Sequence, residues 1–192
     1  MDLQSRASSF INSFPGIAGA ASEANQIFES KYYGKPKNIQ WQELQRGKIY
    51  TFDYELPSDE MTPGGFIDRR PIVIIIPPPA GFPRFSLFGL DLNLLPPSNR
   101  ANFISKYADV LGVSYSQDGK IENIFNDDKS SRLTLQNASM LTQDYPVSRI
   151  VKGFDVRYIS GFIEISPEDW FLLPYLNDFK IQGTTIAKIY NP

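Results

Sequence analysis

A run of β-branched residues between prolines sets strict conditions on the fold. Residues 71–79 read Pro-Ile-Val-Ile-Ile-Ile-Pro-Pro-Pro. Apolar side chains on such a strand point to both faces of a sheet, so other parts of the chain must cover both faces. The prolines lack the N–H that a sheet ladder needs, so the strand ends at Ile76. The sequence therefore predicts a buried strand inside a layered domain.

Four further segments are predicted to be strands. Residues 46–54 alternate, with aromatic side chains on one face, and residues 84–92 form a third apolar strand. Gly89 in that strand indicates a bulge or a close backbone approach. Residues 155–165 alternate as one strand, and residues 184–190 are predicted to close the sheet. Together these segments favour a mainly β (α+β) fold.

The predicted helices are short and peripheral. Residues 99–111 follow Ser98 as a cap, and residues 133–141 are expected to form a short helix. Ser166 is the clearest helix cap in the chain, because Pro167 and two acidic residues follow it in the first turn. That helix is predicted to end near Leu173. In the helix predicted at residues 99–111, the side chains expected to face inward are Phe103, Ile104, Tyr107, Val110 and Leu111.

The first 38 residues differ from the rest of the chain. Two short amphipathic helices, separated by Pro15-Gly16, are too small to form a core of their own and need a partner surface. The sequence divides into an N-terminal docking arm and linker, residues 1–38, and a β-barrel-like domain, residues 39–192, with an excursion at 113–130. The arm either folds back on its own domain or docks on a neighbouring subunit. The residues predicted to bind a partner are Leu3, Phe10, Ile11, Phe14, Ile17, Ile27 and Phe28.

The composition excludes several kinds of chemistry. The chain has no histidine and no cysteine, so it cannot hold a Ser-His-Asp triad, a thiolate nucleophile or a zinc site with nitrogen or sulfur ligands. We expect no catalytic residues, no metal, no cofactor and no small-molecule substrate. No apolar run approaches the roughly 20 residues of a membrane span. The net charge of −2 argues against a protein that coats nucleic acid.

A local basic patch remains compatible with this charge. Aromatic residues lie among the lysines near residues 31–48, and aromatic rings with cations can stack on single strands. For the lysines, the alternative is a solvated linker that its aromatic residues anchor. For Arg69 and Arg70, the alternative is that Asp68 pairs with one of them. The residues that could contact nucleic acid are Lys35, Lys37, Lys48, Arg69 and Arg70.

Part of the chain resembles the small-barrel endoribonuclease toxins. A strand from Gly47 to Tyr50, a glycine-containing loop and Arg70-Pro71 before a β-branched strand follow the opening of those proteins. The resemblance implies an SH3-like barrel. In the toxins such an arginine stabilises the phosphate charge that develops during RNA cleavage. Catalysis here would need a carboxylate as general base, because the chain has no histidine.

Two separated stretches resemble a family of small virion-associated proteins of tailed bacteriophages, mainly the large myophages. The first contains residues 47–54, Asp68, Pro71, then Gly-Leu-Asp-Leu-Asn-Leu-Leu-Pro at 89–96 and Arg100. The second reads Phe-Ile-Glu-Ile-Ser-Pro-Glu-Asp-Trp at 162–170, followed by Leu173-Pro174 and Phe179. Their order and spacing match the family over about residues 46–111 and 147–182.

The resemblance implies a function outside enzymology. Members of the family are often described as DNA-end protectors or as structural proteins. We therefore expect a non-enzymatic structural component of the virion, in the tail, baseplate or neck, that contacts other virion proteins. The alternative implied by the same resemblance is a protein that binds and protects the end of the packaged DNA.

Overall fold

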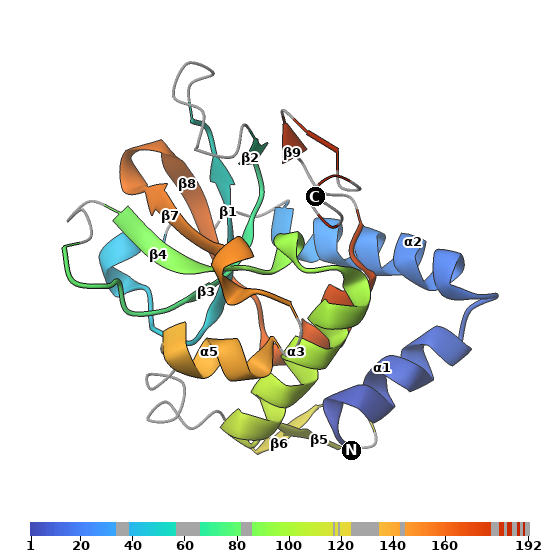
Figure 1. Cartoon of the computed structure of the whole chain (residues 1–192). Coiled ribbons are helices and arrows are strands. Elements are labelled where there is room, and N and C mark those ends of the chain that lie inside the picture. Colours follow the sequence, from blue (N-terminus) through green and yellow to red (C-terminus); the bar gives the residue numbers. More distant parts are fainter. Residues whose placement is uncertain are drawn as a thin grey trace.

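The computed structural model of the 192-residue chain describes residues 1–33, 39–56, 66–81, 86–116, 118, 120–123, 135–142 and 145–177. Near the C-terminus it also describes residues 181, 182, 184, 185, 188 and 190. The fold is α+β, with a five-stranded antiparallel sheet and several helices. Figure 1 shows the main helices grouped on one side of the sheet.

The sheet has the strand order β7-β4-β3-β1-β8. Its strands are β1 (Ile49–Tyr54), β3 (Ile72–Ile75), β4 (Ser86–Asp91), β7 (Val151–Asp155) and β8 (Ile159–Glu164). The buried strand predicted from the proline-bounded run is confirmed as β3, at the centre of the sheet. Its side chains alternate between two apolar clusters: Ile72 and Ile74 face the helices, and Val73 and Ile75 face the other side.

The second apolar cluster is lined by aromatic side chains. Tyr50, Phe52 and Tyr54 share one face of β1, as predicted, and the Phe52 ring meets those of Phe154 and Phe162 at centroid distances of 5.3 and 5.1 Å. The two apolar clusters cover the two faces of the central strands, so both faces are buried.

Gly89 of β4 confirms a predicted close approach. A Cβ at this position would lie 2.3 Å from Cγ1 of Val73 and 2.6 Å from the carbonyl oxygen of Ile74. Only a residue without a side chain lets β3 and β4 pair here.

The strand predicted over residues 155–165 is confirmed for β8, but its start is wrong, because Val156–Tyr158 form a 3₁₀ turn. This turn joins β8 to β7, and the two strands lie at opposite edges of the sheet. The Asp155 side chain accepts a hydrogen bond from the Arg157 N–H and caps this turn. Within the described residues the two edge strands do not pair, so the sheet is open and a closed barrel is not formed.

Helices cover one face of the sheet. They are α1 (Leu3–Asn12), α2 (Ile17–Phe28), α3 (Pro97–Leu111) and α5 (Leu135–Leu141), with the 3₁₀ helix η6 (Pro167–Tyr175) beside α3. Ser166 caps η6 as predicted. The α3 helix starts two residues earlier than predicted, with Pro96 rather than Ser98 at the N-cap position. Val110 was expected to face inward but is 52% exposed, because it falls at the margin of the apolar face that Tyr107 and Leu111 define.

The remaining elements are short. A π-helical turn η1 (Glu29–Tyr33) continues α2, and single 3₁₀ turns are η2 (Trp41–Glu43), η3 (Leu92–Leu94) and η4 (Val147–Arg149). Two small ladders pair β2 (Ile67–Asp68) with β9 (Ile181–Gln182) and β5 (Ser114–Tyr115) with β6 (Ile121–Asn123). The predicted excursion at 113–130 begins with this second ladder, and residues 124–130 lie outside the described part. The strand predicted at 184–190 is wrong, since Lys188 and Tyr190 are helical.

Candidate functional site

A buried arginine lies at the centre of the motif residues. Arg100 in the first turns of α3 is 0% exposed. Its Nη1 donates to the carbonyl oxygens of Leu173 and Leu176, at 2.9 and 3.0 Å, and its Nη2 donates to that of Leu95 at 3.1 Å. A guanidinium offers several donors in a fixed plane, which suits it to holding three carbonyls at once. Arg100 thereby fastens α3 to the C-terminal end of η6.

A tyrosine connects this arginine to an asparagine. Arg100 Nη2 also donates to the Tyr190 hydroxyl at 3.1 Å, and that hydroxyl donates to the carbonyl oxygen of Asn93 at 3.0 Å. The Asn93 Nδ2 in turn donates to Oδ2 of Asp68 at 2.7 Å and to the carbonyl oxygen of Arg70 at 3.1 Å. We call Asp68, Asp91, Asn93, Arg100 and Tyr190 the motif network.

The two carboxylates of the motif network cap local turns. Asp68 Oδ1 accepts from the N–H of Arg70 at 3.0 Å, and Asp91 Oδ1 accepts from the N–H of Asn93 at 3.1 Å. Both carboxyls are buried, and burial raises the pKa of Asp68 to about 6. Burial also raises the pKa of Asp91 well above its ordinary value, and the nearby Asp68 charge raises it further. The site thus holds more acidic groups than its single buried guanidinium can neutralise, which favours a retained proton.

The motif network acts on the chain itself. Its hydrogen bonds join the entry of β3, the turn after β4, the start of α3 and the end of η6. Asp68, Asp91, Asn93 and Arg100 are all buried, so a macromolecule cannot reach their side chains. The arrangement is suited to fixing the relative positions of loops rather than to binding a partner directly.

A second polar contact fastens the end of the arm. Oδ2 of Asp169 accepts a 2.5 Å contact from Lys31 Nζ and a hydrogen bond from the Tyr32 hydroxyl. The same hydroxyl accepts from the Ser166 N–H at 3.2 Å. Burial, and then the hydrogen bond and charge of Asp169, raise the pKa of Tyr32 above its ordinary value. The first-turn acid of η6 therefore holds η1 against the body.

The residues predicted to bind a partner are divided between the interior and the surface. Leu3 and Phe28 are buried against the chain's own body, and both belong to the main apolar cluster. Ile17 is 70% exposed. The half-buried members of the set are Phe10, Ile11, Phe14 and Ile27. Leu3 and Phe28 are thus occupied by intramolecular contacts, whereas the exposed and half-buried residues retain surface that a partner can contact.

The predicted basic residues do not form one open patch. Lys48 pairs with Glu164 at 3.1 Å, and Arg70 pairs with Asp53 at 3.0 Å. The Arg70 guanidinium also lies 4.5 Å above the Tyr33 ring. Arg69 donates to the carbonyl oxygen of Leu56 at 3.0 Å. Asp68 was predicted to pair with one of these arginines. It accepts a hydrogen bond from the backbone N–H of Arg70, not from a guanidinium. Lys35 and Lys37 lie outside the described residues.

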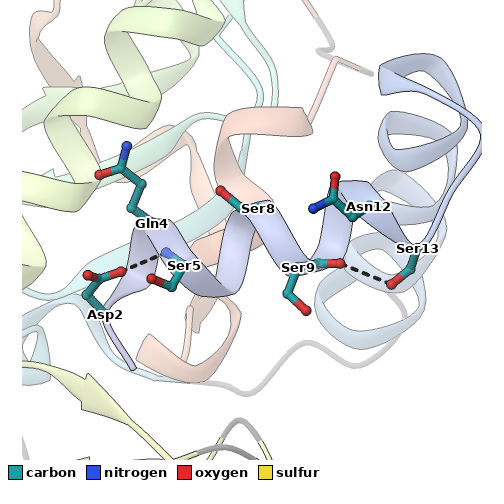
Figure 2. A pocket seen from close by; sticks show the side chains of 7 residues that line it. All are labelled: Asp2, Gln4, Ser5, Ser8, Ser9, Asn12 and Ser13. Carbon is teal, nitrogen blue, oxygen red and sulfur yellow. Dashed lines mark hydrogen bonds between the residues drawn. The ribbon is translucent and has the colours of Figure 1, made fainter.

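The surface of α1 is polar and uncharged over most of its length. Figure 2 shows a shallow depression along this helix, lined by side chains that carry hydroxyl or amide groups and by Asp2. Asp2 caps the helix, since its Oδ1 accepts from the Ser5 N–H at 2.7 Å. A second cavity of about 210 Å³ lies between α1, α3 and η6, and Gln4 and Ser8 line both hollows. This face is an accessible part of the arm.

Sequence reasoning placed Asp91, Asn93 and Arg100 in a motif and Asp169 in the first turn of a helix, but it did not predict what they or Tyr32 contact. One signal was available for the first two: they are polar residues inside the apolar run Leu90–Leu95, where an unpaired polar side chain would be costly. The Asn93 side chain donates to groups 23 and 25 residues earlier, which spacing could not identify.

The sequence matches no known protein-family model, and neither a curated protein nor a solved structure matches it. In the part of the chain that the structure describes, no helix is long and apolar enough to cross a membrane. The same residues contain no group of three or more acidic side chains placed to hold a metal ion.

Proposed function

We propose that this chain is a non-enzymatic structural component of a tailed-phage virion, which works through protein–protein contacts in the tail, baseplate or neck. One observation carries the proposal. The positions that resemble the virion family, among them Asp68, Asn93 and Arg100, come together in one buried network. Such a network gives the motif residues a structural role inside the protein, which does not require them to bind a ligand at the surface.

The arrangement supports a rigid body with a contact surface on one helix. The motif network joins loops around the sheet through hydrogen bonds of buried side chains, and hydrogen bonds are stronger at the low dielectric of a protein interior. The uncharged face of α1 offers hydroxyl and amide groups together with the half-buried Phe10 and Phe14. Interfaces commonly combine buried aromatic anchors with a polar rim.

We also propose that the sheet is an open variant of the SH3-like barrel. Three observations support this: the strands follow a meander in which the last strand returns to the first, a 3₁₀ turn joins the two edge strands, and a cluster rich in aromatic side chains covers the face away from the helices. A small barrel gives an assembly a compact module whose edges can pair with neighbouring strands.

The experiment is to locate the chain in purified particles. Heads and tails of the phage that encodes it are separated, and the chain is quantified in each fraction by mass spectrometry. We expect a fixed copy number in the tail fraction. Presence only with heads and packaged DNA would favour the DNA-end-protector function, and absence from both fractions would contradict a virion role.

A further inference from the structure

The α1 helix is held much more loosely than α2. Of its ten residues only Leu3 is buried, whereas α2 buries Ala20, Ala21, Ala24 and Phe28. The cavity of about 210 Å³ lies beneath α1, where a well-packed helix would leave no space. Missing contacts on one side of a side chain reduce its attraction, so α1 is the part of the arm that opens at the lowest cost.

The body nevertheless carries a specific seat for α1. The N-terminal ammonium of Met1 donates to the carbonyl oxygen of Tyr115 at 2.5 Å. The Arg6 guanidinium lies 4.9 Å from the Tyr115 ring centre and 4.3 Å from that of Phe171. The Phe10 ring meets the Phe171 ring at 5.3 Å. An occupant of this seat needs an arginine and, four residues later along a helix, an aromatic residue.

A hinge separates α1 from α2. Gly16 has φ 90° and ψ 174°, a conformation that residues with a side chain rarely adopt. Pro15 precedes it, and residues 13–16 connect the two helices. Extended, these four residues span about 13 Å, so rotation at the hinge moves α1 as a rod away from the body.

We propose that α1 is exchanged between two copies of this chain, so that each copy's α1 fills the seat on the other. A second copy is the occupant because its α1 carries the arginine and the phenylalanine that the seat receives. Exchange repeats the same contacts between molecules and needs a new conformation only at the hinge. The proposal does not rest on a virion role, since exchange can occur whatever particle contains the chain.

The absence of cysteine from the chain allows a direct test. One preparation carries Ala7→Cys and a second, differently tagged preparation carries Ala101→Cys; both positions line the cavity beneath α1. The two are incubated together at high concentration, and a short bis-maleimide is added. Exchange predicts a cross-linked heterodimer whose yield rises with concentration. A chain carrying both cysteines is the positive control, and it should cross-link internally when dilute.

Two glycine variants test the role of the hinge. Gly16→Ala strains the closed hinge and is expected to raise the heterodimer yield about tenfold. Gly112→Ala places the same substitution at a positive φ of 70° after α3, away from the hinge, and should leave the yield unchanged. Internal cross-linking without heterodimer at any concentration would overturn the proposal, as would an equal effect of the two variants. If Gly16→Ala does not fold, the heterodimer yield of the Ala7→Cys and Ala101→Cys pair, measured against concentration with Gly16 in place, still tests the proposal.

Discussion

The Nδ2 atom of Asn93 lies 2.7 Å from Oδ2 of Asp68, a residue 25 positions earlier in the chain. Both side chains are buried, and Asn93 is the donor that reaches the buried carboxylate from outside its own loop. Their contact joins the entry of β3 to the turn that follows β4. The motif network depends on this contact, because Asn93 also links Asp68 to Tyr190 and Arg100.

Asn93→Ala is expected to lower the free energy of unfolding by about 3 kcal/mol. The substitution leaves a buried carboxylate without a side-chain donor, and buried polar groups that lose a partner keep their full desolvation cost. Urea denaturation followed by circular dichroism measures the change. Asn12→Ala on the exposed face of α1 is the matched control and should shift stability by less than about 0.5 kcal/mol. Equal effects would show that Asn93 has no special role.

The stability of the protein should fall as the pH rises from about 4 to about 7. The pKa of Asp68 is raised from 3.8 to about 6, so the folded protein holds this proton more tightly than the unfolded chain. The resulting stabilisation is complete below about pH 4 and is lost as the pH rises through 6. Asp91, whose pKa is raised in the same direction, extends the loss to higher pH. Thermal denaturation across this range measures the slope.

Two variants test which carboxyl groups cause the dependence of stability on pH. Asp91→Asn keeps an oxygen acceptor for the Asn93 N–H and removes the carboxyl that extends the loss, so it should remove the part of the slope above about pH 6. Asp53→Asn removes a half-exposed carboxylate and should leave the slope unchanged. Exposed acids with lowered pKa, such as Asp155, act in the opposite direction and only below about pH 4. A slope above about pH 6 that persists in Asp91→Asn and disappears in Asp53→Asn would contradict the assignment.

Tyr32→Phe is expected to destabilise the arm more than Lys31→Met. The Tyr32 hydroxyl is buried, donates to Asp169 and accepts from Ser166, so its loss should cost about 1–2 kcal/mol. The Lys31 side chain is 47% exposed, and ion pairs of that kind contribute at most about 1 kcal/mol. Amide hydrogen exchange of residues 29–33 measures the local opening. The reverse order would mean that the ion pair, rather than the hydroxyl, holds η1.

Binding to DNA ends should be weak in the native protein and increase when the acidic partners are removed. Lys48 and Arg70 are paired with Glu164 and Asp53, which reduces the positive field available to phosphates. The double variant Asp53→Asn/Glu164→Gln should therefore bind DNA more tightly at low salt, with a steeper salt dependence. Fluorescence anisotropy with a blunt duplex measures both. Tight, steeply salt-dependent binding by the native protein would instead support DNA-end protection.

Local patterns in the sequence predicted the local parts of the fold. The central strand, the Ser166 cap and the close approach at Gly89 each depend on residues within a few positions of one another. The division of residues 151–164 into two edge strands was missed because alternation continues through Val156–Tyr158, where only the Asp155 cap sets the turn. A strand lies at the edge of a sheet when no other strand pairs with its outer side, and the sequence of the strand itself does not contain that information.

The candidate site was harder to predict than the fold. Arg100 contacts carbonyl groups 73 and 76 residues later, and nothing in its own neighbourhood distinguishes it from a surface arginine. The arm illustrates a different difficulty: amphipathic spacing placed Leu3 and Phe28 on an apolar face, but it could not tell whether they contact this chain or another. Only the tertiary structure separates those two cases.

Amide hydrogen exchange in the free protein and in purified particles tests the central claim most directly. We propose that the motif network stabilises the body and that α1 is the contact element. The account therefore predicts that residues 3–12 exchange rapidly in the free protein and slowly in the particle, whereas the amides of Asn93 and Arg100 exchange slowly in both. Unchanged exchange of α1 on assembly, or rapid exchange at Asn93 and Arg100 in the free protein, would contradict it.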